Sequence, residues 1–436
     1  MKNFIWLTFI WWFFTPSVAY AYLDPGSGNA LIYMVLSFFG AVVFTLKGLF
    51  YKLLGKKDLL ENEQALEENQ NNIVIFNEGK MYWNTFRPIV EALIKKNVVF
   101  SYYTMDINDP CLEIDELNMN NRYIGNGTRA FAKISKLKAD VVLSTTPNIG
   151  TKDYPISRSK SIKKLVHVFH AFDDLTCYHR GSLDNYDAVM LVGEFEKPII
   201  RKLENLRGLP AKELFEAGLP YLDALEEKKN SAPKRTDKPS DTETILIAPS
   251  WGMKSCLYQY GSRFISLLAQ AGFHIIIRPH PQSLKVESEF LEQIKNELNS
   301  FQNIEWDFNI DGSQSMQRAD ILISDTSSVR VDFLFIYQKP IITLEIPFEN
   351  MTDFEMADLG ESWKEQALKN MGYTLGKDRI EDLPDIVHEV ISTKAPEEII
   401  AFREKNIYNY KRSGEVIANY LIENGQQLKN GYFDAR

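Results

Sequence analysis

The chain has 436 residues, of which 45% are hydrophobic and 25% charged, and its net charge is −9. This balance is typical of a folded globular protein and excludes wholesale disorder, and the length predicts two or three domains. The acidic charge argues against a nucleic-acid partner. Cys111, Cys177 and Cys256 lie far apart and form no CxxC pair, so neither a disulfide framework nor a zinc site is expected.

Residues 1–57 contain two uncharged stretches. The first follows Lys2 and ends in an A-x-A pattern at 19–21, which resembles a secretory signal peptide. The second, residues 25–46, is long enough to span a bilayer with its flanks. We therefore expect a signal-like segment and a transmembrane anchor; two buried core helices are the alternative reading.

Lysines follow the second uncharged stretch and predict its orientation: Lys47, Lys52, Lys56 and Lys57. By the positive-inside rule they mark the cytoplasmic side. Either a cleaved signal followed by one span, or an uncleaved signal forming a hairpin of two spans, leaves the rest of the chain in the cytoplasm. The expected location is a plasma or inner membrane, with the catalytic part cytoplasmic.

A polar tether is expected over 58–72, and a first domain over 73–225. Short apolar, β-branched runs alternate there with helical patterns, which indicates a parallel sheet covered on both faces. The predicted strands are IVIFN (73–77), VVFSYY (98–103), VVLSTT (141–146), LVHVFH (165–170) and AVMLV (188–192).

The stretch 226–243 is rich in charge and proline and predicts a linker between domains. The alternation restarts over 244–385, and the remaining residues, 386–436, have helical patterns. The fold class is therefore α/β, with two doubly wound Rossmann-like domains. The strands expected in the second domain are TILIAPS (244–250), FHIIIR (273–278), ADILIS (319–324) and PIITLEI (340–346).

Ligands of open parallel sheets bind beyond the carboxyl ends of the strands, so the residues there are candidates. Ser324, Asp325, Ser327 and Ser328 stand between a predicted strand and a helix that starts near Val329. Hydroxyls beside a helix N-terminus can bind phosphate, although simple N-capping explains the same residues. We assign Asp325 to capping or to a hydroxyl, because its charge would repel a phosphate.

Four further residues are candidates for the same site. Asp332 lies four residues beyond Ser328 and either reaches a ligand hydroxyl or is a solvated helix residue. Arg278 and His280, in Arg-Pro-His-Pro, suit a diphosphate, with a rigid turn as the alternative. Trp251 either stacks on a base or packs between domains.

Two histidines occur in His167-Val-Phe-His170, and their spacing puts them on opposite faces of a strand. His170 lies at the strand end, where a general base belongs, and has a usable pKa range near neutrality. His167 is expected to be a satisfied core histidine. No metal site and no cofactor are expected.

Several short motifs together resemble the family of CDP-glycerol glycerophosphotransferases, which includes teichoic-acid primases and polymerases. The matching pieces are EGKMYW (78–83), HVFHAF (167–172), GLPYLD (218–223), IAPSWG (247–252), RPHP (278–281) and ISDTSSVRVDF (323–333). The resemblance implies a GT-B fold and transfer of glycerol phosphate from CDP-glycerol to an acceptor hydroxyl, with release of CMP.

The resemblance also implies roles for individual residues. His170 matches the proposed base, Arg278 and His280 match donor diphosphate residues, and Ser327 and Ser328 match phosphate-binding serines. Glu78 and Gly79, in the first motif, are acceptor-site candidates. The chain departs from the family's HGT, Gly-x-Pro-Arg, Thr-Trp-Arg and SDYSS patterns at Ala171-Phe172, Tyr221, Ser250 with Gly252, and Thr326.

The favoured interpretation is a membrane-anchored transferase that uses CDP-glycerol or a related CDP-alcohol. The expected acceptor is a hydroxyl of a membrane-linked glycan. Two alternatives remain open at this point: a GT-B glycosyltransferase that uses a nucleotide sugar, and a non-catalytic scaffold of an envelope-polymer complex.

Overall fold

The structure, a computed structural model, describes residues 71–231, 242–309, 311–346, 352–393 and 396–427. They fall within one compact unit, Asn69–Arg436. The signal-like segment and anchor expected over 1–57, and nearly all of the expected tether, lie outside the described residues. Within the described ranges, no helix combines the length and apolar character needed to cross a membrane.

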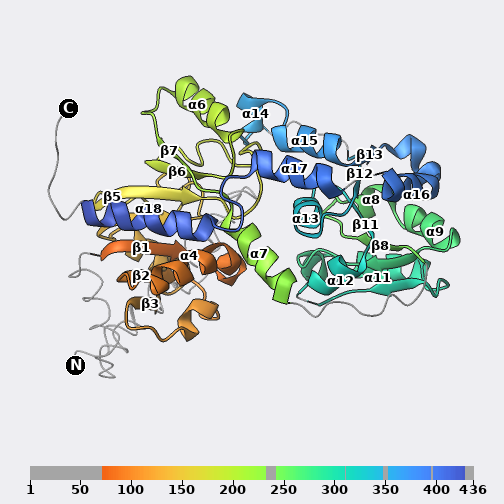
Figure 1. Cartoon of the computed structure of the whole chain (residues 1–436), viewed down its shortest axis with the longest axis horizontal. Coiled ribbons are helices and arrows are strands. Elements are labelled where there is room, and N and C mark those ends of the chain that lie inside the picture. Colours follow the sequence, from red (N-terminus) through yellow and green to blue (C-terminus); the bar gives the residue numbers. More distant parts are fainter. Residues whose placement is uncertain (1–70, 232–241, 310, 347–351, 394–395, 428–436) are drawn as a thin grey trace, which may run out of the picture. The chain divides into compact units, whose positions relative to one another are not determined.

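The first domain is built on a parallel sheet in the order β3-β2-β1-β4-β5-β6-β7 (Figure 1). Its central strands are buried on both faces, which explains their continuous apolar sequences. The strands are β1 (Asn71–Asn77), β2 (Phe100–Thr104), β3 (Met119–Tyr123), β4 (Ala139–Ser144), β5 (Ile162–Val168), β6 (Ala188–Leu191) and β7 (Glu213–Glu216).

Amphipathic helices complete the first domain. In α4 (Trp83–Lys95), the buried residues Phe86, Ile89, Val90 and Leu93 recur at helical spacing and pack in the core of the sheet. The other helical elements are η1 (Lys80–Tyr82), η2 (Pro110–Glu113), α5 (Gly127–Ile134), α6 (Glu196–Arg207) and α7 (Pro220–Ser231).

The second domain repeats this plan with a parallel sheet in the order β10-β9-β8-β11-β12-β13. Its strands are β8 (Thr244–Ile247), β9 (His274–Ile277), β10 (Ile304–Trp306), β11 (Ile321–Ser324), β12 (Ile341–Leu344) and β13 (Tyr373–Leu375). The strand order reverses between β8 and β11 in this sheet and between β1 and β4 in the first. Ligand crevices form at such switch points.

The helical elements of the second domain connect these strands. They are α8 (Cys256–Tyr260), α9 (Arg263–Gln270), α10 (Ser283–Val286), α11 (Ser288–Glu297), α12 (Ser313–Arg318), α13 (Val329–Asp332), the π-helix η3 (Phe333–Tyr337), α14 (Met356–Leu359), α15 (Trp363–Met371), η4 (Lys377–Asp382) and α16 (Leu383–Thr393). The helix predicted to start near Val329 begins there but continues as a π-helix.

Two features at the domain junction differ from the sequence expectation. The helix α7 runs to Ser231, six residues into the range expected as a linker, because Glu, Lys and Asn can continue a helix without apolar contacts. The last two helices, α17 (Pro396–Asn406) and α18 (Ser413–Gln427), follow the second domain in sequence. Of these, α18 packs against α4 and β1 of the first domain (Figure 1).

The return of the chain to the first domain explains why the GLPYLD motif begins with a glycine. Gly218 has φ +93, and a Cβ there would lie 2.1 Å from the carbonyl oxygen of Tyr408, in the connection between α17 and α18. Only glycine combines that backbone conformation with such a close approach.

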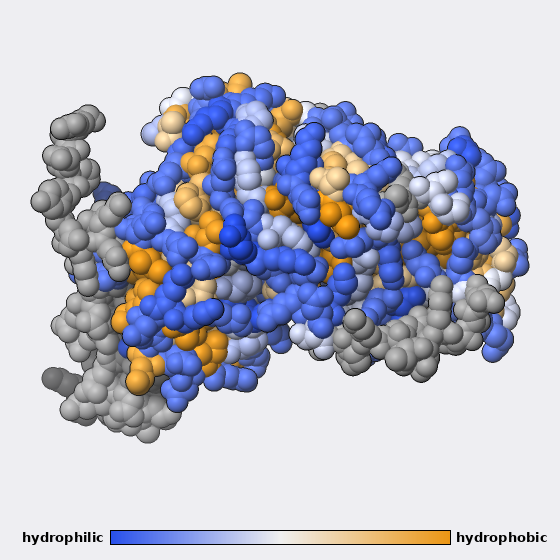
Figure 2. All heavy atoms as spheres, viewed as in Figure 1, coloured by the Kyte–Doolittle hydropathy of each residue, from blue (hydrophilic) through white to orange (hydrophobic). Residues whose placement is uncertain are grey.

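The surface is mainly hydrophilic on the face drawn in Figure 2. Apolar side chains gather chiefly over the part of the first domain that contains β1 to β3 and α4 (Figure 2). The exposed apolar residues of that part of the chain include Val99, Ile107 and Leu117.

Candidate active site

Asp325 joins the motifs of the second domain. It follows β11, its side chain is fully buried, and its carboxylate accepts hydrogen bonds from the backbone N–H groups of Ser250 (3.0 Å), Cys256 (2.7 Å) and Ser327 (3.1 Å). Charged acceptors make strong hydrogen bonds of this kind. Asp325 therefore holds the β8–α8 loop against the serine loop, and its oxygens are occupied by backbone donors.

Ser324 has a similar structural position. Its buried hydroxyl donates to the carbonyl oxygen of Ala248 at 2.5 Å, which ties the ends of β8 and β11 together. The sequence placed Ser324 among the candidates for donor binding, but its hydroxyl proton is already donated to the backbone. It therefore shapes the site without offering that proton to a ligand.

Ser327 and Ser328 remain accessible at the same strand end. Ser327 is half-buried and Ser328 is exposed, and α13 begins directly after them at Val329. Their carbonyl oxygens accept the N–H groups of Arg330 and Val331, so these hydrogen bonds within the helix do not use the hydroxyls. The two serines can therefore donate to an anion above the sheet.

His280 lies beside this cradle with a defined ring orientation. Its Nδ1 accepts the N–H of Gln282 at 3.1 Å, so the neutral ring carries its proton on Nε2. Burial lowers the pKa of His280, while nearby Asp325 and Glu287 act to raise it. The neutral imidazole can thus donate one hydrogen bond to a phosphate oxygen.

Arg278 has an intramolecular partner. Its guanidinium lies 2.7 Å from a carboxylate oxygen of Asp307, which also accepts the hydroxyl of Ser315 at 2.5 Å. A Cβ at Gly312 would lie 2.6 Å from Nε of Arg278, so the glycine makes room for this side chain. The structure therefore places Arg278 in an ion pair below the strand ends, with part of its hydrogen-bonding capacity used.

Trp251 lies on the rim of the second domain. Its side chain is 51% exposed, and the N–H of the following Gly252 donates to Glu287 at 2.8 Å. The indole does not pack in the core. Its free face can stack on a planar ligand.

The first domain brings His170 and Glu78 into one neighbourhood. The ring of His170 lies edge-on to Tyr82 at 4.9 Å, and Glu78 accepts the hydroxyl of Tyr154 at 2.7 Å. Burial, and then the charge of Glu78, raise the pKa of Tyr82, which lies between them. Gly79 is buried, and its N–H donates to Asn77.

The electrostatics of His170 favour the neutral ring. Burial lowers its pKa, and Asp173 opposes that shift. Its buried Nδ1 has no hydrogen-bond partner within the described part of the chain. Sequence reasoning missed Tyr82 and Tyr154, although Tyr82 lies within the EGKMYW motif.

His167 is a core residue, as predicted, but it is not satisfied. It is fully buried among the rings of Phe169, Tyr178 and Tyr186. Neither ring nitrogen has a hydrogen-bond partner among the described residues, and burial lowers the pKa of His167 to about 3. The ring is therefore neutral at physiological pH.

Asp332 contacts the first domain. Its carboxylate accepts the hydroxyl of Tyr221 at 2.8 Å, across the junction between α7 and α13. Burial raises the pKa of Asp332 to about 7, and the hydrogen bond from Tyr221 opposes that shift. Asp332 is therefore not a solvated helix residue, and Tyr221, at a departure from the family pattern, is its partner.

Within the described ranges, no group of three or more His, Cys, Asp or Glu side chains is arranged to hold a metal ion. The accessible groups at the strand ends are hydroxyls, imidazoles and one indole. This set can bind an anionic phosphate ester and accept a proton from a hydroxyl.

Known proteins resemble this chain in sequence and in fold. Residues 156–350 match the family model of CDP-glycerol:poly(glycerophosphate) glycerophosphotransferase. This range contains every motif quoted above except EGKMYW. No curated protein sequence matches the chain significantly.

Solved structures show the same fold at low identity. The wall teichoic acid polymerase TagF is 16% identical, with a TM-score of 0.55 over 88% of this chain and 97% of that chain. A TagF variant soaked with CDPG is 15% identical, with a TM-score of 0.52 over 88% and 97%. The UDP-GlcNAc 2-epimerase of Methanocaldococcus jannaschii, in complex with UDP-GlcNAc and UDP, is 17% identical, with a TM-score of 0.51 over 80% and 99%.

The family match over residues 156–350 agrees with the resemblance seen in the motifs and supports a CDP-glycerol glycerophosphotransferase-like transferase. The two parallel-sheet domains resemble those of the GT-B-like structures above, which confirms the predicted domain class.

Proposed function

We propose that this enzyme transfers glycerol phosphate, or a related alcohol phosphate, from a CDP-alcohol to a hydroxyl of a membrane-linked envelope glycan or polymer. The observation that carries the proposal is the meeting of the IAPSWG, RPHP and SDTSS segments, all within the region that matches the family: Asp325 accepts the N–H groups of Ser250 and Ser327, and the N–H of Arg278 donates to Ile247 at 2.8 Å. That convergence gathers His280, Ser327 and Ser328 at one strand edge, where a diphosphate can bind.

His170 is the proposed base. In the reaction, the acceptor oxygen forms a bond to the phosphorus that carries the alcohol, and the bond from that phosphorus to the CMP oxygen breaks. The acceptor proton goes to His170, which burial keeps neutral and able to accept it. CMP leaves with the electron pair, and the hydrogen-bond donors of the second domain stabilise its negative charge.

Asp332 and Tyr221 belong to the junction between the two domains rather than to the phosphate cradle. Tyr221 stands where the family pattern has arginine, so one cation of that pattern is replaced by a neutral hydroxyl. We therefore propose that the part of the site near Tyr221 receives the alcohol or the acceptor, whose identity this substitution affects.

We also propose that the enzyme acts at the cytoplasmic face of a plasma or inner membrane. The support is the sequence of residues 1–57 alone: two uncharged stretches followed by lysines. A reporter fused after Arg436 that is active only outside the membrane should remain silent, and activity of that reporter would overturn the orientation.

A donor screen tests the chemistry. The full chain in detergent is titrated with CDP-glycerol, CDP-ribitol, CMP and UDP-sugars, and its melting temperature is followed, since a ligand that binds the native state raises it. Selective stabilisation by the cytidine compounds is expected. Selective stabilisation by a UDP-sugar would instead favour a glycosyltransferase, and no stabilisation by any nucleotide would favour a non-catalytic scaffold.

A further inference from the structure

The segment that carries His170 is held by the second domain. This segment connects β5 to β6, and Asp174 within it is fully buried. The carboxylate of Asp174 accepts the hydroxyl of Ser362 at 2.7 Å and the N–H of Lys364 at 2.8 Å. Asp174 therefore binds the N-terminal turn of α15, whose free N–H groups favour an anion.

Backbone hydrogen bonds join the same segment to residues 353–356. The N–H of Glu355 donates to the carbonyl of Tyr178 at 2.8 Å, and the N–H of Arg180 donates to the carbonyl of Asp353 at 3.0 Å. The ring of His179 stacks on Phe354 at 4.4 Å. The base-carrying segment is thus fixed by a part of the chain that lies beyond the region matching the family.

Arg330 connects α15 to the serine loop. It is only 1% exposed, and its guanidinium makes a two-pronged ion pair with Glu365 at 2.7 and 3.0 Å. Its Nε donates to the carbonyl oxygen of Ser327 at 3.1 Å. Arg330 therefore binds both the backbone of Ser327 and the third residue after the Ser362 cap.

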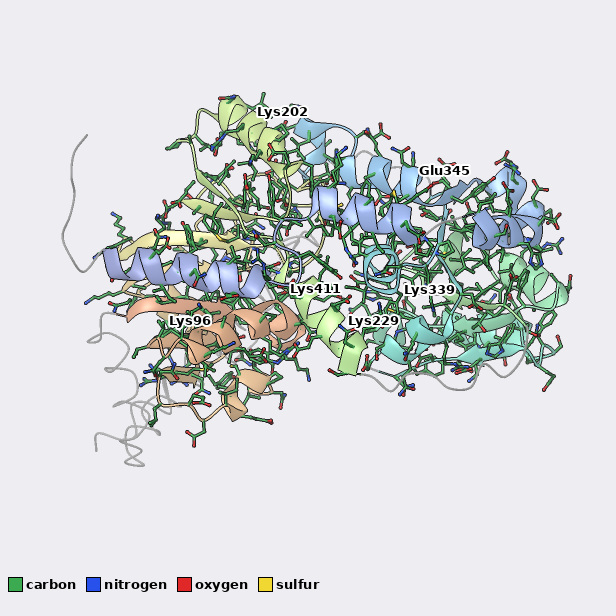
Figure 3. The ribbon with its side chains drawn as sticks, viewed as in Figure 1. Lys96, Lys202, Lys229, Lys339, Glu345 and Lys411 are labelled. Carbon is green, nitrogen blue, oxygen red and sulfur yellow. The ribbon has the colours of Figure 1, made fainter. Side chains whose placement is uncertain are left out.

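Contacts of Lys364 and Phe172 connect the second domain to the segment that carries His170. The ammonium of Lys364, adjacent to Glu365, lies 3.4 Å from Asp173, three residues after His170. Phe172 packs against Phe335 of η3, with ring centroids 5.3 Å apart, and against Trp363 of α15. In the view with side chains, α13 lies near the labelled Lys339, and α15 lies on the side of the labelled Glu345 (Figure 3).

A buried ion pair of this kind is weak evidence for stability, because removing two charges from water costs much of what their attraction returns. The planar guanidinium and the carboxylate pair in one geometry, which restricts the relative positions of the two segments that carry them. Here the ion pair joins the loop with the phosphate-binding serines to the helix that caps the base-carrying segment.

We propose that Arg330 and Glu365 are positioning residues that fix the Ser327–Ser328 loop relative to the segment carrying His170. The inference rests on the proposed function, since it gives these two residues a role in the same transfer. Loss of the pair misplaces the base relative to the donor phosphates, and displacements of about 1 Å can reduce a rate ~10²-fold.

The test uses the full chain in detergent, with Glu365→Gln as the first variant because Glu365 is partly exposed and the change is nearly isosteric. CDP-glycerol affinity is measured by calorimetry, and CMP release is measured at saturating donor with membrane extract as acceptor. We expect CMP release to fall ~10-fold or more and the CDP-glycerol Kd to rise by a smaller factor. Arg330→Lys keeps the charge but not the fork, and it should behave like Glu365→Gln.

Arg263→Gln is the control, since the exposed Arg263 makes a two-pronged pair with Glu381 through Nε and Nη2 in the same domain, outside this connection. It should leave both measurements unchanged. If Glu365→Gln lowers only the melting temperature, with Kd and CMP release as in wild type, the pair is structural and the inference is overturned. If wild type itself does not bind CDP-glycerol, the proposed function fails and this inference fails with it.

Discussion

The two halves of the candidate site are built differently. In the second domain, the proposed phosphate-binding side is organised by backbone N–H groups that donate to one buried carboxylate, Asp325. In the first domain, His170 lies among aromatic rings and its Nδ1 has no partner within the described residues. The segment that carries His170 is fixed instead by α15 of the other domain.

Because of this difference, we expect donor affinity and the rate of the chemical step to depend on different residues. The second-domain half can bind a phosphate ester with groups held by its own strand ends, whereas the base depends on contacts between the two domains. Substitutions in one half should therefore change donor affinity, and substitutions in the other should change the rate of the chemical step.

The largest expected effect is the loss of the base. His170→Ala should lower kcat ~10²–10⁴-fold, because the acceptor proton loses its receiver, while the affinity for CDP-glycerol stays close to that of wild type. Turnover is measured as CMP release, and His388→Ala, an exposed histidine, is the control.

The pH profile sharpens the same prediction. Because burial lowers the pKa of His170, activity should fall only as pH drops below the ordinary histidine range near 6.5 and the ring becomes protonated. His170→Ala should lose that acid limb. Near-normal turnover with an unchanged limb would show that His170 is structural.

The next effect concerns the contact between Tyr221 and Asp332. The pKa of Asp332 is about 7 in the folded protein, against 3.8 in the unfolded chain. Between these pH values the folded protein holds a proton that the unfolded chain has released, so the free energy of unfolding should fall as pH rises through that window. The loss should be ~2–4 kcal/mol, and it should disappear in Asp332→Asn. Unfolding in urea from pH 4 to 8 measures it.

Tyr221→Phe serves as the counterpart to that variant. The hydroxyl of Tyr221 stabilises the ionised carboxylate, so its removal should extend the loss of stability to higher pH. Equal pH dependence in wild type and Asp332→Asn would contradict the assignment of the slope to this carboxylate.

Asp325→Asn tests the organisation of the donor half. An amide supplies one acceptor oxygen where the carboxylate supplied two, so at least one buried N–H group loses its partner. We expect a loss of ~2–3 kcal/mol in the free energy of unfolding and weaker CMP binding. Unchanged stability in urea would show that Asp325 does not hold the β8–α8 loop and the serine loop together.

The smallest predicted effect concerns the serine hydroxyls. The double substitution Ser327→Ala and Ser328→Ala should weaken CDP-glycerol binding by about tenfold, since hydrogen bonds to charged groups contribute ~1.5–3 kcal/mol each and water replaces part of that. The melting temperature should hardly change. Thr326→Ala, at an exposed neighbouring position, is the calorimetric control, and equal Kd values for both variants would remove the serines from the site.

Much of the fold follows from local sequence patterns. Every strand predicted from a continuous apolar run is present, because central parallel strands are buried on both faces. The strands β3, β7, β10 and β13 were not predicted. All four are edge strands, which have only one neighbouring strand and, as in MNNRY, need no continuous apolar run.

Part of the candidate site could also be predicted from the sequence. His280, Ser327 and Ser328 stand within a few residues of strand ends and belong to the quoted motifs. The partners of Arg278, Asp332 and Asp174 could not be predicted, because each lies far along the chain, as Tyr221 does from Asp332. The buried role of Arg330 could have been suspected from the sequence, because it is a cation among the apolar residues of the ISDTSSVRVDF motif.

The return of α18 to the first sheet means that the polypeptide crosses between the domains twice. Asn406 and Tyr408 lie on that second crossing, and their carbonyl oxygens approach the first domain at Gly193 and Gly218 so closely that a Cβ would clash. A protein hinged on a single strand of chain can twist freely as it opens. With two crossings, relative rotation of the domains must bend both connections at once, so we expect the domains to twist against one another less than a single connection would allow.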